Sequence, residues 1–285
     1  MTTSQLLNVG CGQTFHPAWV NVDMKSSSLH VIEHDLTRGL PFPDKTFGVC
    51  YSSHVLEHLE REEAGLFLRE QKRVLQDGGI VRVVVPDLEQ ICRNYLAFLA
   101  ELLAGNRGAE FKYDYTLLEL FDQVVRDETG GELLRLWYTG KIADPDFVRS
   151  RSGIEAEGIL SPQPRRAPAA PLKKNAPLRR IGRQIATGWM RARLRMAEAF
   201  VAILLGARGT GALRVGLFRR SGEVHRVMYD RFSLTRLLRA QGFRDVRFVS
   251  ATKSQIPNFD QYGLDAVEGV TRKPDSIFVE ATRGD

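Results

Sequence analysis

The chain has 285 residues, 43% of them hydrophobic, which is enough for one elaborated domain or two small ones with a substantial core. Its three cysteines, Cys11, Cys50 and Cys92, are too few and too scattered for a disulfide framework, and none forms a C-x-x-C pair typical of zinc or redox sites. The N-terminus lacks the basic and apolar regions of a secretory signal, and no uninterrupted apolar run reaches the roughly 18 to 20 residues of a membrane span, so we expect a cytoplasmic protein.

The net charge of +6 is unevenly distributed along the chain. Residues 163–220 hold fourteen Lys or Arg and a single acidic residue, Glu198, which gives this stretch a charge of +13 and leaves −7 for the remainder. Nucleic-acid-binding domains are often basic throughout, whereas this pattern indicates an acidic body that carries a basic insert.

Short β-branched runs alternate with helical patterns in the first hundred residues and predict a parallel α/β sheet. Residues 60–76 have the apolar spacing of an amphipathic helix, which the following "QDGG" should stop, and residues 88–103 form a second predicted helix. The predicted strands are residues 6–10, 19–23, 30–35, 47–53 and 80–87.

The second half of the chain is less regular. Residues 113–138 are predicted to be helical, and residues 161–177 contain five prolines, which favours an extended or disordered linker. A helix that ends at Gly242 and strands at residues 245–251 and 276–282 are predicted near the C-terminus.

Polar and glycine residues gather where the first four predicted strands end. Gly10 and Gly12 follow the first strand, where a backbone without side chains lets N–H groups approach a ligand. Asp23 ends the second strand and could accept hydrogen bonds from ribose hydroxyls, although an isolated aspartate can equally form a turn or cap a helix. Strand ends that line one crevice of an α/β sheet predict a site for a nucleotide-like ligand.

The segments "LLNVGCG", "VNVD", "HDLTRGLPFPDKTFGVCYSSHVLEHL" and "LREQKRVLQDGGIVRVVVPD", in this order and spacing, resemble class I S-adenosylmethionine-dependent methyltransferases over about residues 5–90. The resemblance resumes near Gly222. Within this family, the sequence is most similar to a branch found among enzymes of polysaccharide and small-molecule modification. It implies a Rossmann-like α/β fold with a mostly parallel seven-stranded sheet and a helical, basic insertion before the last two strands.

The resemblance also divides the chain and assigns its residues. Residues 1–105 and 222–285 would form the two parts of the methyltransferase domain, with residues 106–221 as the insertion. S-adenosylmethionine would be the cofactor, and the acceptor a hydroxyl of a sugar, a glycan or another small molecule. The cofactor-binding residues would be Asn8, Gly10, Cys11, Gly12, Asp23, Asp35, Leu36, Ser53 and His54.

Two departures from the family pattern concern the methionine end of the cofactor. Asn8 stands where members commonly carry an acidic residue, although its side chain can still accept a hydrogen bond. Only residues 13–18 join the first two strands, whereas a parallel crossover usually needs about a dozen residues or more. Either the first helix of the fold is vestigial, or the two strands end several residues away from these positions.

The histidines permit three readings. His54 and His58 lie in "SHVLEH", which fits the H-x-x-E-H pattern of zinc hydrolases, but a zinc site needs a third ligand that the sequence does not identify, so no metal ligand is assigned. His54, His58 and His225 are candidates for a general base on a hydroxyl acceptor, because a neutral imidazole titrates near physiological pH. They could instead cap or pack the neighbouring helix.

Apolar and arginine residues interleave at helical spacing in residues 178–206 and predict a basic amphipathic helix. Such a helix could dock on the anionic inner face of a membrane, where a lipid-linked acceptor would be found, or it could pack on the catalytic domain as a lid. No aromatic stacking pattern accompanies the arginines, so the sequence does not favour nucleic acid as a partner. A methyltransferase-like scaffold that has lost activity is the alternative to an enzyme.

Overall fold

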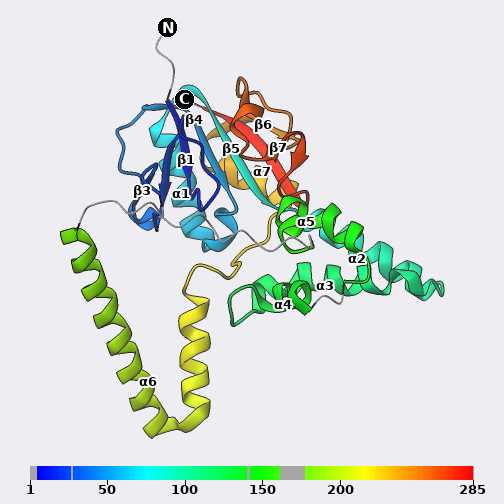
Figure 1. Cartoon of the computed structure of the whole chain (residues 1–285). Helices are drawn as coiled ribbons and strands as arrows, with labels where there is room; N and C mark the ends of the chain where they lie inside the picture. Colours follow the sequence, from blue (N-terminus) through cyan, green and yellow to red (C-terminus); the bar gives the residue numbers. More distant parts are fainter. Residues whose placement is uncertain (1–4, 27, 140–141, 161–176, 285) are drawn as a thin grey trace.

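The computed structural model describes residues 5–26, 28–139, 142–160 and 177–284. Seven strands form one sheet in the order β3-β2-β1-β4-β5-β9-β6 (Figure 1). Neighbouring strands among β1 to β5 pair in parallel, and β9 is antiparallel to both β5 and β6. The strands are β1 (Gln5–Val9), β2 (Val20–Asp23), β3 (Val31–Glu33), β4 (Phe47–Ser53), β5 (Leu75–Pro86), β6 (Phe243–Val249) and β9 (Ser276–Arg283). The mostly parallel seven-stranded sheet is therefore confirmed.

The connection between β1 and β2 contains no helix, as the shortness of residues 13–18 predicts. The strand order reverses between β1 and β4, because the chain moves outward from β1 to β3 and then returns to the other side of β1. In open α/β sheets, ligands bind outside the carboxyl ends of the strands at this switch point. Gly10 and His54, which follow β1 and β4, lie at that position.

One face of the sheet is covered by α1 (Arg61–Val74) and α7 (Arg231–Ala240). Phe67, Leu68 and Leu234 of these helices join the main hydrophobic core with the inward side chains of the strands. The helix predicted for residues 60–76 ends at Val74, and β5 begins at once with Leu75, which pairs with Phe47. The "QDGG" segment thus lies in the first part of the strand, because the buried Leu75 has already turned into the sheet.

Four helices follow β5 and lie outside the sheet: α2 (Leu88–Leu103), α3 (Glu110–Val125), α4 (Gly131–Thr139) and α5 (Pro145–Leu160). They have a small core of their own around Tyr115, Val148 and Ala156. The remaining short elements are the 3₁₀ turns η1 (Leu36–Arg38), η2 (Leu56–His58), η3 (Arg107–Ala109) and η4 (Phe259–Tyr262), and the small strands β7 (Ala266–Val267) and β8 (Val270–Thr271).

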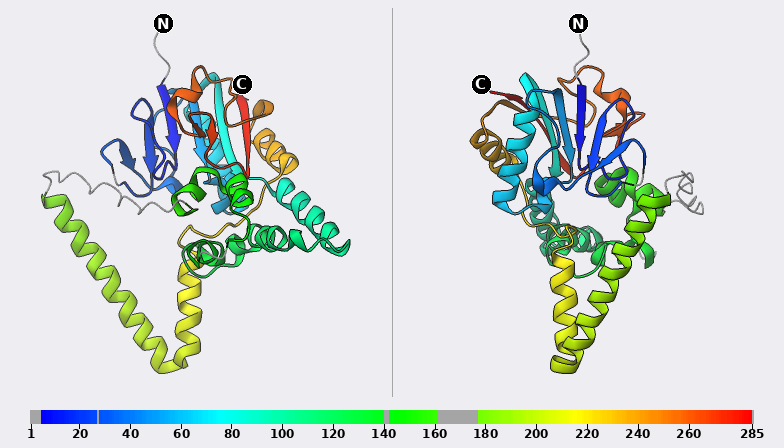
Figure 2. Two further views of the ribbon diagram at one scale, coloured as in Figure 1. Left: turned by 45° about the vertical axis from the view of Figure 1, so that its right-hand side comes forward. Right: turned by 90° about the vertical axis from the view of Figure 1, so that its left-hand side faces the viewer.

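The basic insert continues into α6 (Pro177–Arg219), a helical hairpin that projects away from the sheet (Figures 1 and 2). Its two arms meet at Gly206, whose φ of 63° is not helical. The helix predicted for residues 178–206 corresponds to the first arm, whereas the second arm was not predicted. The proline-rich linker lies outside the described residues, apart from Pro177 at the start of α6.

The opposite face of the sheet is covered by residues 250–275, which are held there by a buried cation. Arg82 of β5 has no exposed surface and donates hydrogen bonds to Asp265 at 2.7 Å and to Glu280 at 2.5 Å. It also donates to the backbone oxygens of Ser250 and Lys253. The guanidinium therefore binds the start and the middle of this segment to the sheet.

Replacing the buried cation should destabilise the protein strongly. Arg82→Met leaves two buried carboxylates without their partner, and we expect the free energy of unfolding to fall by about 3 to 5 kcal/mol in urea denaturation. Arg149→Met is the matched control, because Arg149 also contacts two carboxylates, Asp146 at 2.8 Å and Glu157 at 2.9 Å, but at the surface. Its loss should be much smaller. Equal losses for the two variants would contradict the role given to Arg82.

Candidate active site

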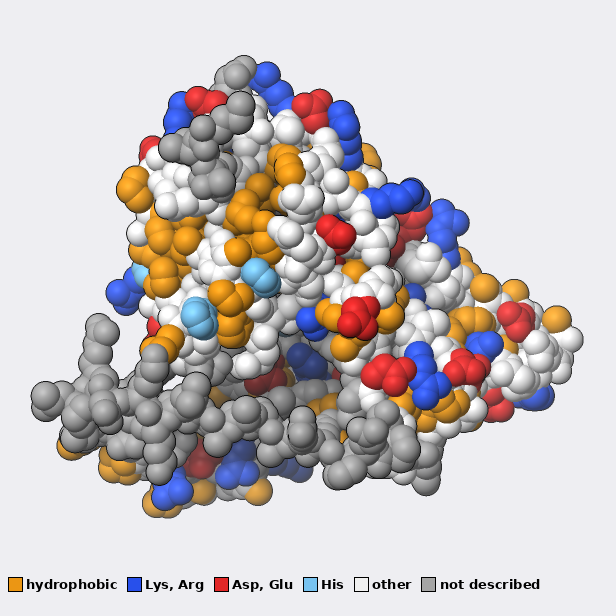
Figure 3. All heavy atoms as spheres, turned by 45° about the horizontal axis from the view of Figure 1, so that its top comes forward, with side chains coloured by type: hydrophobic (Ala, Val, Ile, Leu, Met, Phe, Trp, Pro, Cys, Tyr) orange, Lys and Arg blue, Asp and Glu red, His pale blue; other side chains and the backbone are white. Residues whose placement is uncertain are grey.

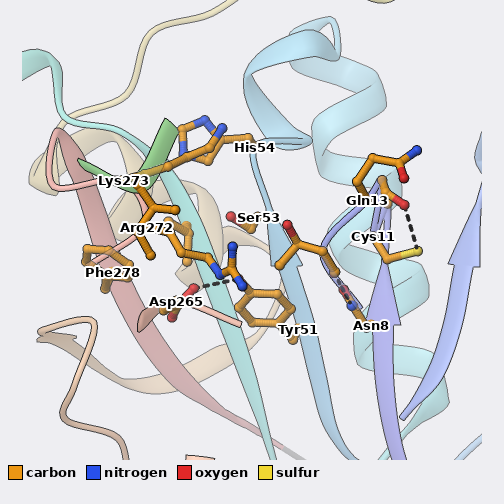
Figure 4. Close-up of a pocket in the computed structure, with 15 residues that line it drawn as sticks. Asn8, Cys11, Gln13, Tyr51, Ser53, His54, Asp265, Arg272, Lys273 and Phe278 are labelled. Carbon is orange, nitrogen blue, oxygen red and sulfur yellow. Dashed lines mark hydrogen bonds between the residues drawn. The ribbon is translucent and has the colours of Figure 1, made fainter. Parts of the chain in front are cut away.

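A cavity of about 330 Å³ opens at the carboxyl ends of β1 and β4 (Figure 4). The loop after β1 forms one side, the end of β4 forms the base, and residues from the C-terminal part of the chain form the other side. Its lining residues are Asn8, Gly10, Cys11, Gly12, Gln13, Thr14, Tyr51, Ser53, His54, Val84, Ile154, Asp265, Arg272, Lys273 and Phe278.

The N–H groups of the glycine loop, residues 10–12, donate hydrogen bonds to β2. The N–H groups of Gly10 and Cys11 donate to the oxygen of Val22, and that of Gly12 donates to Asp23 Oδ2 at 2.8 Å. The expectation that these N–H groups point at a ligand is therefore wrong, because the short crossover draws the loop onto β2. What the glycines provide is a backbone with positive φ, 70° and 52°, and open space beside Gly12.

Asn8 presents an acceptor without a partner. Its Nδ2 donates to the oxygen of Thr14 at 3.1 Å and to Asn21 Oδ1 at 3.2 Å, so both side-chain oxygen lone pairs remain. Oδ1 is buried and has no hydrogen-bond partner among the described residues. A buried acceptor in a cavity wall suits a ligand that donates hydrogen bonds, such as an ammonium group.

The three predicted residues on the far side of β1 do not line this cavity. Asp23 Oδ2 accepts a hydrogen bond from the N–H of Gly12, which lines the cavity, and Asp23 Oδ1 accepts one from the N–H of Lys25. Asp35 caps η1 by accepting from the N–H and the hydroxyl of Thr37, and this bonding lowers its pKa. Leu36 packs against the main core. Asn8, Gly10, Cys11, Gly12, Ser53 and His54 are thus brought together.

Arg272 and Lys273 form a cationic side of the cavity that sequence reasoning missed. Arg272 Nε donates to the oxygen of Gly263, which fixes the guanidinium beside Asp265 (Figure 4). Both residues lie in the turn between β8 and β9, outside any predicted strand. The adjacent basic pair just before the last strand was the one available signal. Such a wall suits an anionic group, for example a carboxylate or a phosphate.

His54 lies between the cavity and a buried carboxylate. It has a φ of 54°, and its Nε2 is 3.0 Å from Ser276 Oγ. Its Nδ1 is 3.0 Å from Glu57 Oε1, a close contact whose angle is not that of a regular hydrogen bond. Burial alone would raise the pKa of Glu57, but His54 and the two other nearby histidines lower it to about 2. Glu57 is therefore an anion that orients the His54 ring.

His58 and His225 lie behind His54 and are not among the lining residues. Their rings meet edge to face, with centroids 4.8 Å apart. Burial lowers the pKa of His58, and it lowers that of His225 to about 3 against the opposing effect of Glu57. Both imidazoles are thus neutral near pH 7, and neither reaches the cavity as a base.

The H-x-x-E-H pattern does not form the helical zinc motif. Residues 56–58 form the 3₁₀ turn η2, and His54 precedes it in a left-handed conformation. The two histidines consequently do not share one face of an α-helix, which the zinc-hydrolase reading requires.

Residues 7–83, from β1 to the middle of β5, match the family model of a methyltransferase domain. The matched residues include the ends of β1 and β4 at the switch point and the side and base of the cavity that follow these two strands. The chain contains a class I S-adenosylmethionine-dependent methyltransferase domain. This is an enzyme domain whose cofactor is S-adenosylmethionine, and the orphan acceptor of Asn8 and the cationic wall fit the ammonium and carboxylate of its methionine part.

Solved structures with related descriptions are only distantly similar. An S-adenosylmethionine-dependent methyltransferase from Mesorhizobium loti is 17% identical with a TM-score of 0.24 and covers 30% of this chain, which spans about half (47%) of that protein. A possible histamine N-methyltransferase from Thermotoga maritima is 10% identical with a TM-score of 0.38, over 99% of this chain and 84% of its own. A methyltransferase from Archaeoglobus fulgidus is 11% identical with a TM-score of 0.37, over 99% and 87%.

TM-scores this low indicate neither an activity nor a substrate. No curated protein matches the chain.

The methyltransferase domain predicts a measurable cofactor affinity that depends on Asp23. We expect micromolar binding of S-adenosylmethionine in calorimetry, and Asp23→Ala should weaken it at least tenfold, about 1.4 kcal/mol. The substitution removes the hydrogen bond from the N–H of Gly12 to Asp23 and also removes an acceptor for the ribose hydroxyls. Asp146→Ala removes an exposed aspartate of α5 and should leave the affinity unchanged. Identical affinities for wild type and Asp23→Ala would contradict the assignment.

Proposed function

We propose that the protein transfers the methyl group of S-adenosylmethionine to a hydroxyl of a sugar, a glycan or another small molecule. Methyl transfer from a sulfonium needs chiefly that the acceptor be positioned in line and that water be excluded. The cavity beside the glycine loop offers such a place, since it is bounded by the described residues on both sides. The observation that carries the proposal is His54, the titratable side chain that connects this cavity to Glu57.

His54 is suited to accept the proton of a hydroxyl acceptor. Glu57 contacts Nδ1 and would stabilise the imidazolium that forms, while Nε2 is 3.0 Å from Ser276 Oγ. A carboxylate that orients an imidazole is the arrangement by which general bases act on hydroxyl groups. A hydroxyl acceptor profits from such a base, because it loses its proton during transfer.

The cationic wall supports an acceptor with an anionic group. Arg272 and Lys273 stand across the cavity from Asn8 and Cys11 (Figure 4). One of them can meet the methionine carboxylate, and the other would then be placed for a phosphate or carboxylate of the acceptor. Phosphorylated sugars and lipid-linked glycans carry such groups.

Replacing His54 should impair turnover more than cofactor affinity. In an assay of tritiated methyl transfer to a panel of sugars, nucleotide sugars and lipid-linked glycans, His54→Gln should lower kcat by about 10²- to 10⁴-fold, the usual contribution of a general base. The KM for S-adenosylmethionine should change only a few-fold. His30→Gln, an exposed histidine, is the control.

Full turnover by His54→Gln would contradict the role of His54 as the general base. No transfer to any acceptor of the panel, by a wild-type protein that binds the cofactor, would overturn the acceptor class.

We also propose that the α6 hairpin places the domain on the cytoplasmic face of a membrane. The end of its first arm exposes Met196, Phe200, Ile203, Leu204 and Leu205 to solvent, Ile203 by 82%. Exposed arginines flank this apolar tip, namely Arg193, Arg195 and Arg208. Apolar side chains at a tip with arginines behind it are typical of a segment that inserts among anionic lipids.

The geometry favours shallow insertion over a full crossing. Among the described helices, Ala192–Arg219 alone is long and apolar enough to cross a membrane by length and composition, and none of it is buried. The break at Gly206 limits the apolar end of the first arm, residues 192–205, to about 21 Å, whereas the hydrocarbon core is roughly 30 Å thick. Glu198 and Arg214 join the two arms at 2.9 Å, which supports the hairpin shape.

The surface of the folded body gives less support to nucleic acid as a partner. In the view of Figure 3, acidic and basic side chains are interspersed along the upper rim and over the part of the molecule that extends to the right. Nucleic-acid sites instead gather basic side chains on one face.

Membrane docking predicts that the hairpin tip controls sedimentation with vesicles. Wild type should sediment with vesicles of phosphatidylglycerol and phosphatidylcholine, and less so at high salt. The double variant Ile203→Glu, Leu204→Glu should sediment at least tenfold less, because two charges replace the inserted side chains. The double variant Leu96→Glu, Leu103→Glu changes two exposed leucines of α2 and should behave as wild type. Equal sedimentation of the two double variants would refute docking through α6.

A further inference from the structure

Three metal-ligand side chains from two distant parts of the chain converge behind His54. Glu57 and His58 belong to η2, and His225 lies between α6 and α7. Their ligand atoms all lie within 4.8 Å of one another. This cluster is separate from the helical H-x-x-E-H motif, because its third member comes from the C-terminal part of the chain.

The cluster is buried and its ligand atoms lack hydrogen-bond partners. Glu57 has no exposed surface, and His225 is 4% exposed. Both carboxylate oxygens of Glu57, Nδ1 of His58 and Nδ1 of His225 are without a hydrogen-bond partner among the described residues. Unsatisfied buried polar atoms are costly, and one ligand atom from each of the three residues lies within 4.8 Å of the others, which indicates a group that binds among them.

The backbone holds the three side chains in place. The N–H groups of Arg226 and Val227 donate to the oxygen of Glu57, at 2.7 and 3.2 Å. The N–H of His225 donates to the oxygen of Gln123 in α3, and the backbone of Val224 hydrogen-bonds the His58 side chain. The ligand set is therefore preorganised by the fold, and it does not depend on exposed, mobile side chains.

We propose that Glu57, His58 and His225 bind one divalent transition-metal ion of the zinc class. Two imidazoles and one carboxylate form a ligand set that suits Zn²⁺, whereas Mg²⁺ and Ca²⁺ prefer oxygen ligands throughout. With bonds of about 2.0 to 2.1 Å, tetrahedral ligand atoms stand about 3.3 Å apart, so binding draws the three side chains together by small rotations.

The ion would connect three parts of the molecule. Glu57 contacts His54 of the cavity, His225 is bound to α3, and residues 220–224 lead directly from α6. A metal at this junction fixes the end of the hairpin to the loop that carries the proposed base. It also orients Glu57, so its role is one of positioning. Metal binding can be measured without cofactor or acceptor, so the result is independent of the proposed function.

The test is titration of the full chain, stripped with a chelator, with Zn²⁺ alone in competition with a chromophoric chelator. We expect one ion per chain, and His225→Gln and Glu57→Gln should weaken binding by more than about 100-fold, since even loss of an outer partner of a metal ligand costs about 10- to 100-fold. His30→Gln should bind as wild type. Zn²⁺ should also raise the Tm of wild type and not that of His225→Gln.

Ligation by His225 has a spectroscopic signature that mere folding defects cannot produce. His225→Cys supplies a thiolate in place of the imidazole, and Co²⁺ should then show sulfur-to-metal charge-transfer absorption that wild type lacks. Circular dichroism checks that each variant is folded. Absence of tight Zn²⁺ binding by wild type, or binding that a folded His225→Gln retains in full, would overturn the proposal.

Discussion

The arrangement of the site depends on one buried cation, Arg82. Its guanidinium lies against the ring of Phe259 at 4.5 Å and binds Asp265 and Glu280, which are 183 and 198 residues away along the chain. Tyr51 donates its hydroxyl to the same Asp265 at 2.5 Å. An isolated charge in this position would be very costly, so the segment that brings Asp265 must fold onto the sheet. That segment also carries the cationic wall of the cavity.

The cavity is thereby assembled from two halves with different structural support. The glycine loop and His54 follow strands whose register is set by parallel pairing, which places them at the switch point regardless of their side chains. Arg272 and Lys273 belong to a turn that the sheet does not position by itself. Their location follows from the bond of Arg272 to Gly263 and from the ion pairs of Asp265 nearby. The two halves of the cavity are therefore positioned by separate sets of contacts.

The sequence was sufficient to predict the parts of the fold that local pattern determines. Apolar runs and their spacing predicted the strands of the sheet and α2, and the six residues after "VGCG" predicted a crossover without a helix. Residues 75–79 were misassigned, because the "QDGG" segment, which usually marks a turn, lies inside the first part of β5. Arg272, Lys273 and the partnership of Glu57 with His225 were beyond prediction, since each depends on contacts between residues far apart in the chain.

The histidines illustrate why a short motif cannot be interpreted without its backbone. "SHVLEH" places two imidazoles four residues apart, and on an α-helix both would bind one ion. The positive φ of His54 instead turns the first imidazole toward the cavity, while η2 directs Glu57 and His58 inward to His225. One sequence motif thus divides between two sites that share Glu57. Because this carboxylate contacts both, an ion bound by Glu57, His58 and His225 would alter the electrostatic environment of His54, and Glu57 would couple the segment that follows the α6 hairpin to the cavity.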